Sequence, residues 1–166
     1  MSGILRKPNY FMDSVLAVNK KADFDYKILE KYEAGLVLFG YEVKSIKAGH
    51  ISLKEAYIDM RTDSAGDTKL FLLKAHVSKY GPAGELKDYN PTRPRQVLLH
   101  QKEIAHLIGK KKQAGLTLVP IKLYTKNSFI KLEFGVGQGK KKYDKREDIK
   151  KKDVTRHLRT LTKERR

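Results

Sequence analysis

Residues 116–136, LTLVPIKLYTKNSFIKLEFGV, predict a β-hairpin and with it the fold class. In the second half of the stretch, Ile130, Leu132, Phe134 and Val136 face one way and the charged Lys131 and Glu133 the other, which is the period of a half-buried strand. We expect strands over Leu116–Tyr124 and Phe129–Val136, with Lys126-Asn127-Ser128 as the tight turn between them. The chain is therefore expected to contain an antiparallel sheet.

Upstream of the hairpin, shorter runs carry strand patterns. Phe24–Ile28 alternates apolar and charged residues, and Leu36–Phe39 follows, so these runs predict two strands joined at or near Gly35. Tyr57–Arg61 and Leu70–Val77 are further strand candidates.

Two helices are predicted among these strands. One covers Tyr41–Lys47 and is closed by Ala48-Gly49, and the other covers His100–Lys112 and ends at Gly115. Short strands without a βαβ rhythm favour a mainly β fold, a small antiparallel barrel of the oligonucleotide-binding (OB) type with flanking helices. The stretch between Val77 and Val97 is too broken by Gly and Pro for a regular element, which is typical of a functional loop.

The charge balance favours a polyanionic partner. Thirty-six Lys and Arg residues stand against 19 Asp and Glu residues, a net charge of +17. Nucleic acid is the first expectation and an anionic membrane surface the second. The sequence has no cysteine and no apolar run of about 20 residues. We therefore expect a cytoplasmic protein without a membrane anchor.

Patterning and charge divide the chain into three parts: a flexible leader (1–17) without a hydrophobic period, the barrel (18–138) and a basic C-terminal tail (139–166). The tail holds 13 basic and five acidic residues, a net charge of +8. Val154, Leu158 and Leu161 fall on one helical stripe, but apolar groups are too few to fold alone. The tail is expected to be disordered when free and helical when bound.

Motifs that would indicate an enzyme are missing from the sequence. It has no Gly-x-Ser-x-Gly, no phosphate-binding loop and no His-Glu-x-x-His. The glycines of Gly135–Gly139 have the wrong spacing for a dinucleotide site and fit a flexible junction better. The five histidines show no ligand spacing. We therefore expect no catalytic residues, no metal and no cofactor.

Basic residues near polar and aromatic ones remain as candidates for RNA contacts. They are Asn19-Lys20-Lys21, Lys44 and Lys47, Arg93 and Arg95, and Lys126-Asn127. Cations held at one geometry by a rigid barrel can bind phosphates, although any single lysine is more often a solvated charge. Glu33 could accept hydrogen bonds from a base or pair with a neighbouring lysine, and the sequence leaves both open.

The densest cationic cluster opens the tail, at Lys140–Arg146. Its lysines could neutralise phosphates while Tyr143 stacks on an unpaired base, a contact worth about 1–3 kcal/mol. The alternative is a basic tail that binds any polyanion weakly, without a preferred RNA.

Several blocks together resemble one family. The sequence reads NKKA at 19–22, EAGL at 33–36, GYEVKSIKAG at 40–49, PTRPR at 91–95, LTLVP at 116–120 and GKKKYDKR at 139–146. In this order, over roughly residues 17–160, they resemble the SsrA-binding protein family, also called small protein B.

The resemblance implies an RNA-binding adaptor, not an enzyme, that acts with transfer-messenger RNA (tmRNA) in trans-translation, the rescue of stalled ribosomes. In the family, the barrel binds the tRNA-like domain and takes the place of an anticodon arm. The tail lies in the decoding site and the empty mRNA channel. The partners implied are tmRNA, the ribosome through its small-subunit RNA, and elongation factor Tu, with the protein a monomer.

By position, the resemblance assigns roles to two sets of residues. The implied tmRNA contacts are Asn19, Lys20, Lys21, Glu33, Ala34, Gly35, Lys44, Ser45, Lys47, Lys126 and Asn127. The implied decoding-site and channel residues are Gly139, Lys140, Lys141, Lys142, Tyr143, Asp144, Lys145, Arg146, Ile149, Lys150 and Lys151. Asn90, Gln96 and Gln138 depart from the family's usual residues, which weakens the case for the 90–96 loop as an RNA contact.

Two other classes fit the composition. A structural ribosomal protein is also small, basic and tailed, and it would stay on purified subunits after a high-salt wash. An RNA-processing enzyme would need a carboxylate or histidine whose removal abolishes cleavage, and the sequence offers no such constellation.

Overall fold

The structure is a computed structural model. It describes residues 14–84, 88–112, 115–147, 149 and 154. Residues 1–13 of the predicted leader therefore lie outside the described residues, and so do Lys150 and Lys151 of the tail.

The described part of the chain is built mainly from strands, with short α-helices and one 3₁₀ turn. The strands are β1 (Val15–Val18), β2 (Tyr26–Leu36), β3 (Ile51–Ser52), β4 (Tyr57–Thr62), β5 (Thr68–Leu73), β6 (His76–Val77), β7 (Arg95–Leu98), β8 (Leu116–Lys126) and β9 (Phe129–Gly139). The helices are α1 (Ala22–Asp25), α2 (Gly40–Lys47), η1 (Gly81–Ala83) and α3 (Gln101–Lys111). Residues 142–147 are also helical.

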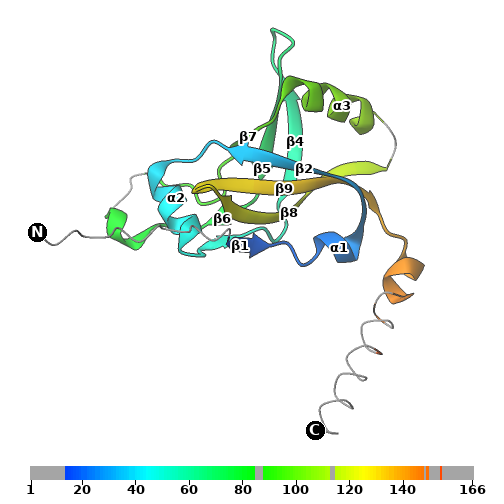
Figure 1. Cartoon of the computed structure of the whole chain (residues 1–166), viewed down its shortest axis with the longest axis horizontal. Coiled ribbons are helices and arrows are strands. Elements are labelled where there is room, and N and C mark those ends of the chain that lie inside the picture. The colour runs from blue at the N-terminus through cyan, green and yellow to red at the C-terminus, as the bar shows by residue number, and fades with distance from the viewer. Residues whose placement is uncertain (1–13, 85–87, 113–114, 148, 150–153, 155–166) are drawn as a thin grey trace, which may run out of the picture.

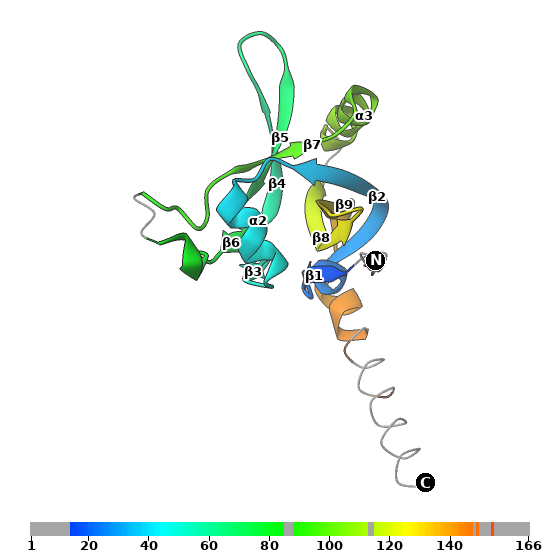
Figure 2. The same ribbon diagram turned by 60° about the vertical axis from the view of Figure 1, so that its left-hand side comes forward.

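The main sheet closes on itself. Its strand order is β1-β8-β4-β5-β7-β2-β9, and β9 also pairs with β8. The ring β8-β4-β5-β7-β2-β9 is therefore a barrel, with β1 added along β8, and its strand pairs are antiparallel (Figures 1 and 2). The predicted mainly β fold, an antiparallel barrel with flanking helices, is confirmed.

The β8–β9 hairpin confirms the sequence pattern. Lys126 pairs with Phe129 across a two-residue turn, in which Asn127 and Ser128 have φ angles of 48° and 69°. Two left-handed residues suit the right-handed twist of the adjoining strands. The apolar face of the hairpin points into the barrel, where Leu123 and Leu132 are fully buried.

The barrel core is continuous from one strand to the next. Its fully buried large side chains include Ile46, Leu70, Leu72, Val77, Leu107, Leu123, Leu132 and Phe134. Ile46 comes from α2 and Leu107 from α3, so each helix is attached to the barrel through its apolar side. On α2, Lys44 and Lys47 stay exposed, whereas Glu42 and Ser45 are buried.

The structure differs from the sequence prediction between residues 24 and 39. Phe24 lies in α1, and Tyr26–Leu36 is one strand that continues through Gly35. Gly35 pairs with Lys131 on one side and Leu98 on the other, so the glycine lies inside the sheet and not at a turn. Val37–Phe39 follow the strand as a connection to α2.

Two other boundaries also differ. The predicted strand Leu70–Val77 is divided into β5 and β6 because Lys74 has a φ of 55°, which breaks the extended backbone. Residues 15–17, assigned to the leader, belong to β1, where Ala17 pairs with Leu123. The barrel thus starts a few residues earlier than predicted.

Candidate RNA-binding surface

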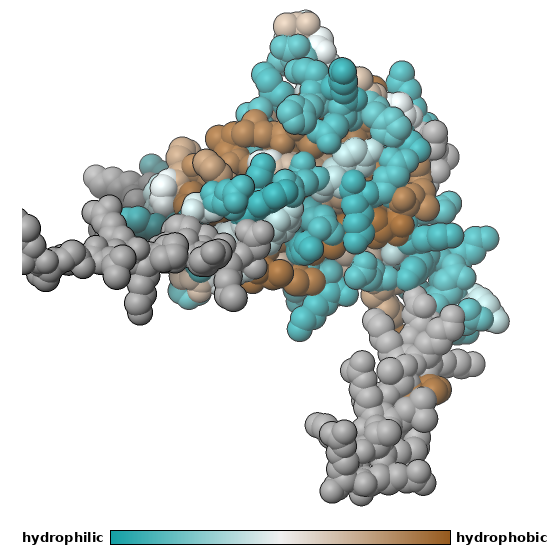
Figure 3. All heavy atoms as spheres, in the orientation of Figure 1, coloured by the Kyte–Doolittle hydropathy of each residue, from teal (hydrophilic) through white to brown (hydrophobic). Residues whose placement is uncertain are grey.

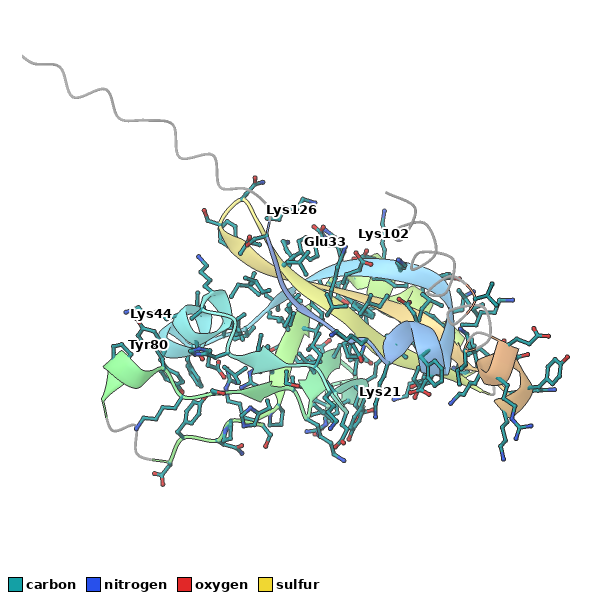
Figure 4. The ribbon with its side chains drawn as sticks, turned by 90° about the horizontal axis from the view of Figure 1, so that it is seen from below. Lys21, Glu33, Lys44, Tyr80, Lys102 and Lys126 are labelled. Carbon is teal, nitrogen blue, oxygen red and sulfur yellow. The ribbon has the colours of Figure 1, made fainter. Side chains whose placement is uncertain are left out.

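Glu33 of β2 lies near the turn of the β8–β9 hairpin, where its carboxylate meets Tyr124 and Lys126. Its carboxylate accepts hydrogen bonds from the Tyr124 hydroxyl and from Lys126 Nζ, at 2.9 Å from Oε2 (Figure 4). These two donors lower the pKa of Glu33 below its ordinary value. The structure thus shows the pairing with a lysine that the sequence left open, and it also fixes the ionised carboxylate on the surface. Asn127 is exposed in the turn next to it.

Ala34 and Gly35 follow Glu33 in β2, and they differ in how far they are exposed at the surface. Ala34 is 1% exposed and belongs to the core, so its predicted contact with RNA is not supported by the position of its side chain. Gly35 is half-buried under Leu98: a Cβ built on Gly35 would lie 3.5 Å from the Leu98 Cβ.

Leu98 is a surface residue that the sequence analysis missed. It is 48% exposed, and Val37 and Phe39 beside the end of β2 are exposed to a similar extent. Figure 3 shows apolar surface gathered over β7 and the end of β2. The run Gln96–Leu99 reads as a buried strand, so no signal in the sequence separates Leu98 from a core residue. This apolar surface can pack against ribose or a base face.

Helix α2 presents two of its three predicted contact residues. Lys44 and Lys47 are exposed, and the Lys44 ammonium lies 5.7 Å from the centre of the Tyr80 ring (Figure 4). Ser45 is fully buried, and its hydroxyl donates to the carbonyl of Ser78 at 2.6 Å. Ser45 therefore holds α2 against the loop that follows β6 and is not itself a surface contact.

Asn19 supports the loop that carries Lys20 and Lys21. Its side chain is nearly buried: Nδ2 donates to the carbonyl of Pro120 at 2.9 Å, and Oδ1 accepts from the Lys21 N–H at 3.2 Å. Lys20 and Lys21 are exposed, beside a hollow lined by β1 and residues 51–54. Asn19 thus holds the backbone of the loop that carries these two lysines instead of presenting its own amide.

The arginines of the 90–96 loop face inward. Arg95 is fully buried and donates to Glu42 Oε1 at 3.0 Å, while Arg93 donates to both oxygens of the same carboxylate. Burial of Glu42 opposes its ionisation, but the bonds from Arg93 and from the Phe39 N–H, with the charge of Arg95, leave its pKa lowered. These arginines join α2 to β7, and Arg95 cannot contact RNA.

The exposed cations differ in whether a carboxylate neutralises them. Lys126 pairs with Glu33, and Lys110 and Lys111 of α3 pair with Glu30 and Asp59. Four of the predicted contacts form no ion pair within the part of the chain that the structure describes: Lys20, Lys21, Lys44 and Lys47. Their charge is available to phosphates, which supports their assignment to an RNA surface.

The start of the tail is placed beside α1. Lys140 binds carbonyls of that helix and Lys145 pairs with Asp25 at 2.7 Å. Tyr143 is 69% exposed, as a stacking role requires, and Ile149 is 46% exposed. Among the described residues, no group of three His, Cys, Asp or Glu side chains is arranged to hold a metal, and no helix is long and apolar enough to cross a membrane.

Comparison with known proteins gives one consistent result. The family model described as SmpB protein matches residues 16–164. The SsrA-binding protein of Anoxybacillus flavithermus is 50% identical over 151 residues, 91% of this chain and 94% of the relative. That of Bacillus pumilus is 50% identical over 144 residues, 87% of this chain and 88% of the relative.

A solved structure, "tmRNA-SmpB: a journey to the center of the bacterial ribosome", holds a similar chain. It is 39% identical with a TM-score of 0.60, over 75% of this chain and 84% of the other. Because the family model covers most of the sequence and relatives match at half of the aligned positions, the chain belongs to the SmpB family of SsrA-binding proteins.

Proposed function

We propose that the protein is an RNA-binding adaptor of tmRNA in trans-translation. The barrel binds the tRNA-like domain and takes the place of an anticodon arm. The basic tail enters the decoding site and the empty mRNA channel of a stalled ribosome. The relatives are named for SsrA binding, and the similar solved structure combines tmRNA with SmpB at the ribosome.

The observation that carries the proposal is the pair of unneutralised cationic sites on one rigid barrel. Lys20 and Lys21 lie on a loop whose backbone the buried Asn19 holds, and Lys44 and Lys47 lie on a helix whose Ser45 is bonded to the loop after β6. Fixed cations can match the phosphates of a folded RNA, whereas flexible ones bind any polyanion. The exposed Leu98 adds an apolar contact for an unstacked nucleotide.

The proposal extends to the oligomeric state of the protein, its location in the cell and its delivery to the ribosome. We infer that the protein acts as a monomer in the cytoplasm and reaches the ribosome with elongation factor Tu. The tail from residue 139 onward is proposed to become helical throughout when it is bound in the channel. The high positive charge and the resemblance support these inferences.

A competition experiment tests the proposal. The full-length protein is bound to labelled tRNA-like domain at physiological salt, and unlabelled tRNA-like domain or bulk tRNA is added. Electrostatics alone gives little preference between two folded RNAs of similar charge. We expect bulk tRNA to compete at least about tenfold less well. Equal competition would contradict recognition of a specific RNA.

A further inference from the structure

Strand pairing brings the start of the tail next to α1. Gly139, the last residue of β9, pairs with Tyr26, the first residue of β2. Helix α1 ends at Asp25, immediately before Tyr26. The chain that leaves the barrel after Gly139 therefore runs along α1, as Figure 1 shows.

Lys140 closes the C-terminal end of α1. Its N–H donates to the carbonyl of Asp25 at 2.9 Å, and its Nζ donates to the carbonyl of Asp23 at 2.7 Å. The last carbonyls of a helix have no partner within the helix, and a cation is favoured there. The first residue of the tail thus supplies both the hydrogen bonds and the charge.

Five residues later, Lys145 binds the same helix through its side chain. Its ammonium is 2.7 Å from Asp25 Oδ1 and 5.8 Å from the centre of the Phe24 ring. The Lys145 and Asp25 side chains are each about one-third exposed. The ion pair therefore joins the helical residues 142–147 to the barrel at a second point.

The helix at 142–147 begins at a fixed place. The N–H of Lys141 donates to Asp144 Oδ2 at 3.2 Å, so the carboxylate three residues later accepts at the start of the helix. With the start fixed and Lys145 held, the other side chains point away: Lys142, Tyr143 and Arg146 are exposed. One side of this helix contacts α1, and the other is left for a partner.

We propose that Asp25 is a positioning residue, which fixes the direction in which the tail leaves the barrel by holding Lys145. The inference rests on the proposed function, because the tail must reach the decoding site while the barrel holds the tRNA-like domain. Two attachment points, at Lys140 and Lys145, define the direction of the tail. With Lys140 alone, the tail could rotate about a single point. In this proposal Lys145 serves to bind Asp25 inside the protein, whereas Lys142, Tyr143 and Arg146 face the ribosome.

The first test measures direction in the full-length protein. The chain has no cysteine, so spin labels can be attached to cysteines introduced at the exposed Lys54 and Glu147. We expect a narrow distribution of distances between the labels. Asp25→Asn should broaden it, and Asp25→Glu, which keeps the carboxylate, should restore it.

The matched control is Asp23→Asn. It removes the same charge from the same helix, but Lys140 binds the Asp23 carbonyl, which the substitution keeps. The distribution should stay narrow in this variant. An unchanged distribution in Asp25→Asn, or equal broadening in Asp23→Asn, would overturn the proposal.

The second test separates this inference from the proposed function. Tagging of a stalled chain is measured beside affinity for the tRNA-like domain. Asp25→Asn should reduce tagging roughly threefold to fivefold, the effect of one partly exposed ion pair, while RNA affinity stays within about twofold of wild type. If Asp25→Asn tags stalled chains as well as the wild-type protein does, the positioning role alone is contradicted. If the wild-type protein itself does not tag stalled chains, the proposed function is contradicted.

Discussion

Arg95 and Glu42 form a charge pair inside the protein: Nε of Arg95 is 3.0 Å from Glu42 Oε1, and neither side chain has exposed surface. Arg95 also donates to the carbonyls of Ala75 and Pro91. The pair therefore ties α2 to β7 and to the loop before it. Through this connection, the lysines of α2 keep a fixed position relative to Leu98.

Glu42→Gln should destabilise the protein strongly. The substitution leaves Arg95 buried without its counter-ion, which typically costs about 3–5 kcal/mol. Urea unfolding measures the loss in free energy of unfolding. Glu33→Gln is the matched control because Glu33 pairs with Lys126 on the surface, where such pairs are worth about 1 kcal/mol or less. Similar losses in both variants would contradict the buried pair.

Gly135→Ala should also destabilise the barrel. A Cβ at this position would lie 2.7 Å from the backbone carbonyl oxygen of Glu30, and backbone cannot turn aside as a flexible side chain can. We expect a loss of about 1–3 kcal/mol in urea unfolding. Gly139→Ala, where nothing lies within 4 Å of the new Cβ, should change the free energy much less.

Substitution by alanine should affect stability differently at Asn19 and at Glu33. Asn19→Ala removes two hydrogen bonds in a nearly buried place, so we expect weaker RNA binding together with a loss of about 1–3 kcal/mol in stability. Glu33→Ala should weaken RNA binding and leave stability nearly unchanged. Binding and urea unfolding of both variants check this difference. Unchanged RNA affinity in both would remove these residues from the RNA surface.

Acid should weaken the attachment of α3. Bonds from Lys110 Nζ and the Tyr32 hydroxyl, with His106 nearby, lower the pKa of Glu30 from about 4.5 to about 2. Because the folded-state pKa is the lower one, this contribution is present above pH 4.5 and is lost as the pH falls toward 2. Backbone NMR shifts of α3 should follow this titration. In Glu30→Gln the same shifts should not titrate in this range, and an unaltered titration would contradict the assignment.

Local patterns made part of this fold predictable. Residues 129–136 have a period of two after a short polar turn, and α2 and α3 are followed by Gly49 and Gly115, which both have positive φ. Such signals lie within a few residues of one another. The class of the fold follows from them, since repeated hairpins without βαβ units close most readily as an antiparallel barrel.

Contacts between residues that are far apart in the sequence could not be predicted in the same way. Arg95 and Glu42 look like surface charges, and only the three-dimensional structure shows that they meet in the interior. For the candidate site, exposed lysines such as Lys44 were predictable as cations. The burial of Ala34 and Ser45 was not, because a short polar or small residue has no pattern of its own.

Truncation after Gln138 tests most directly the claim that barrel and tail have separate tasks. The affinity of the truncated protein for the tRNA-like domain is measured beside tagging of stalled chains. We predict that affinity stays within about tenfold, or 1.4 kcal/mol, of the full-length protein while tagging is lost. A larger loss of affinity, or tagging that persists without the tail, would contradict the account.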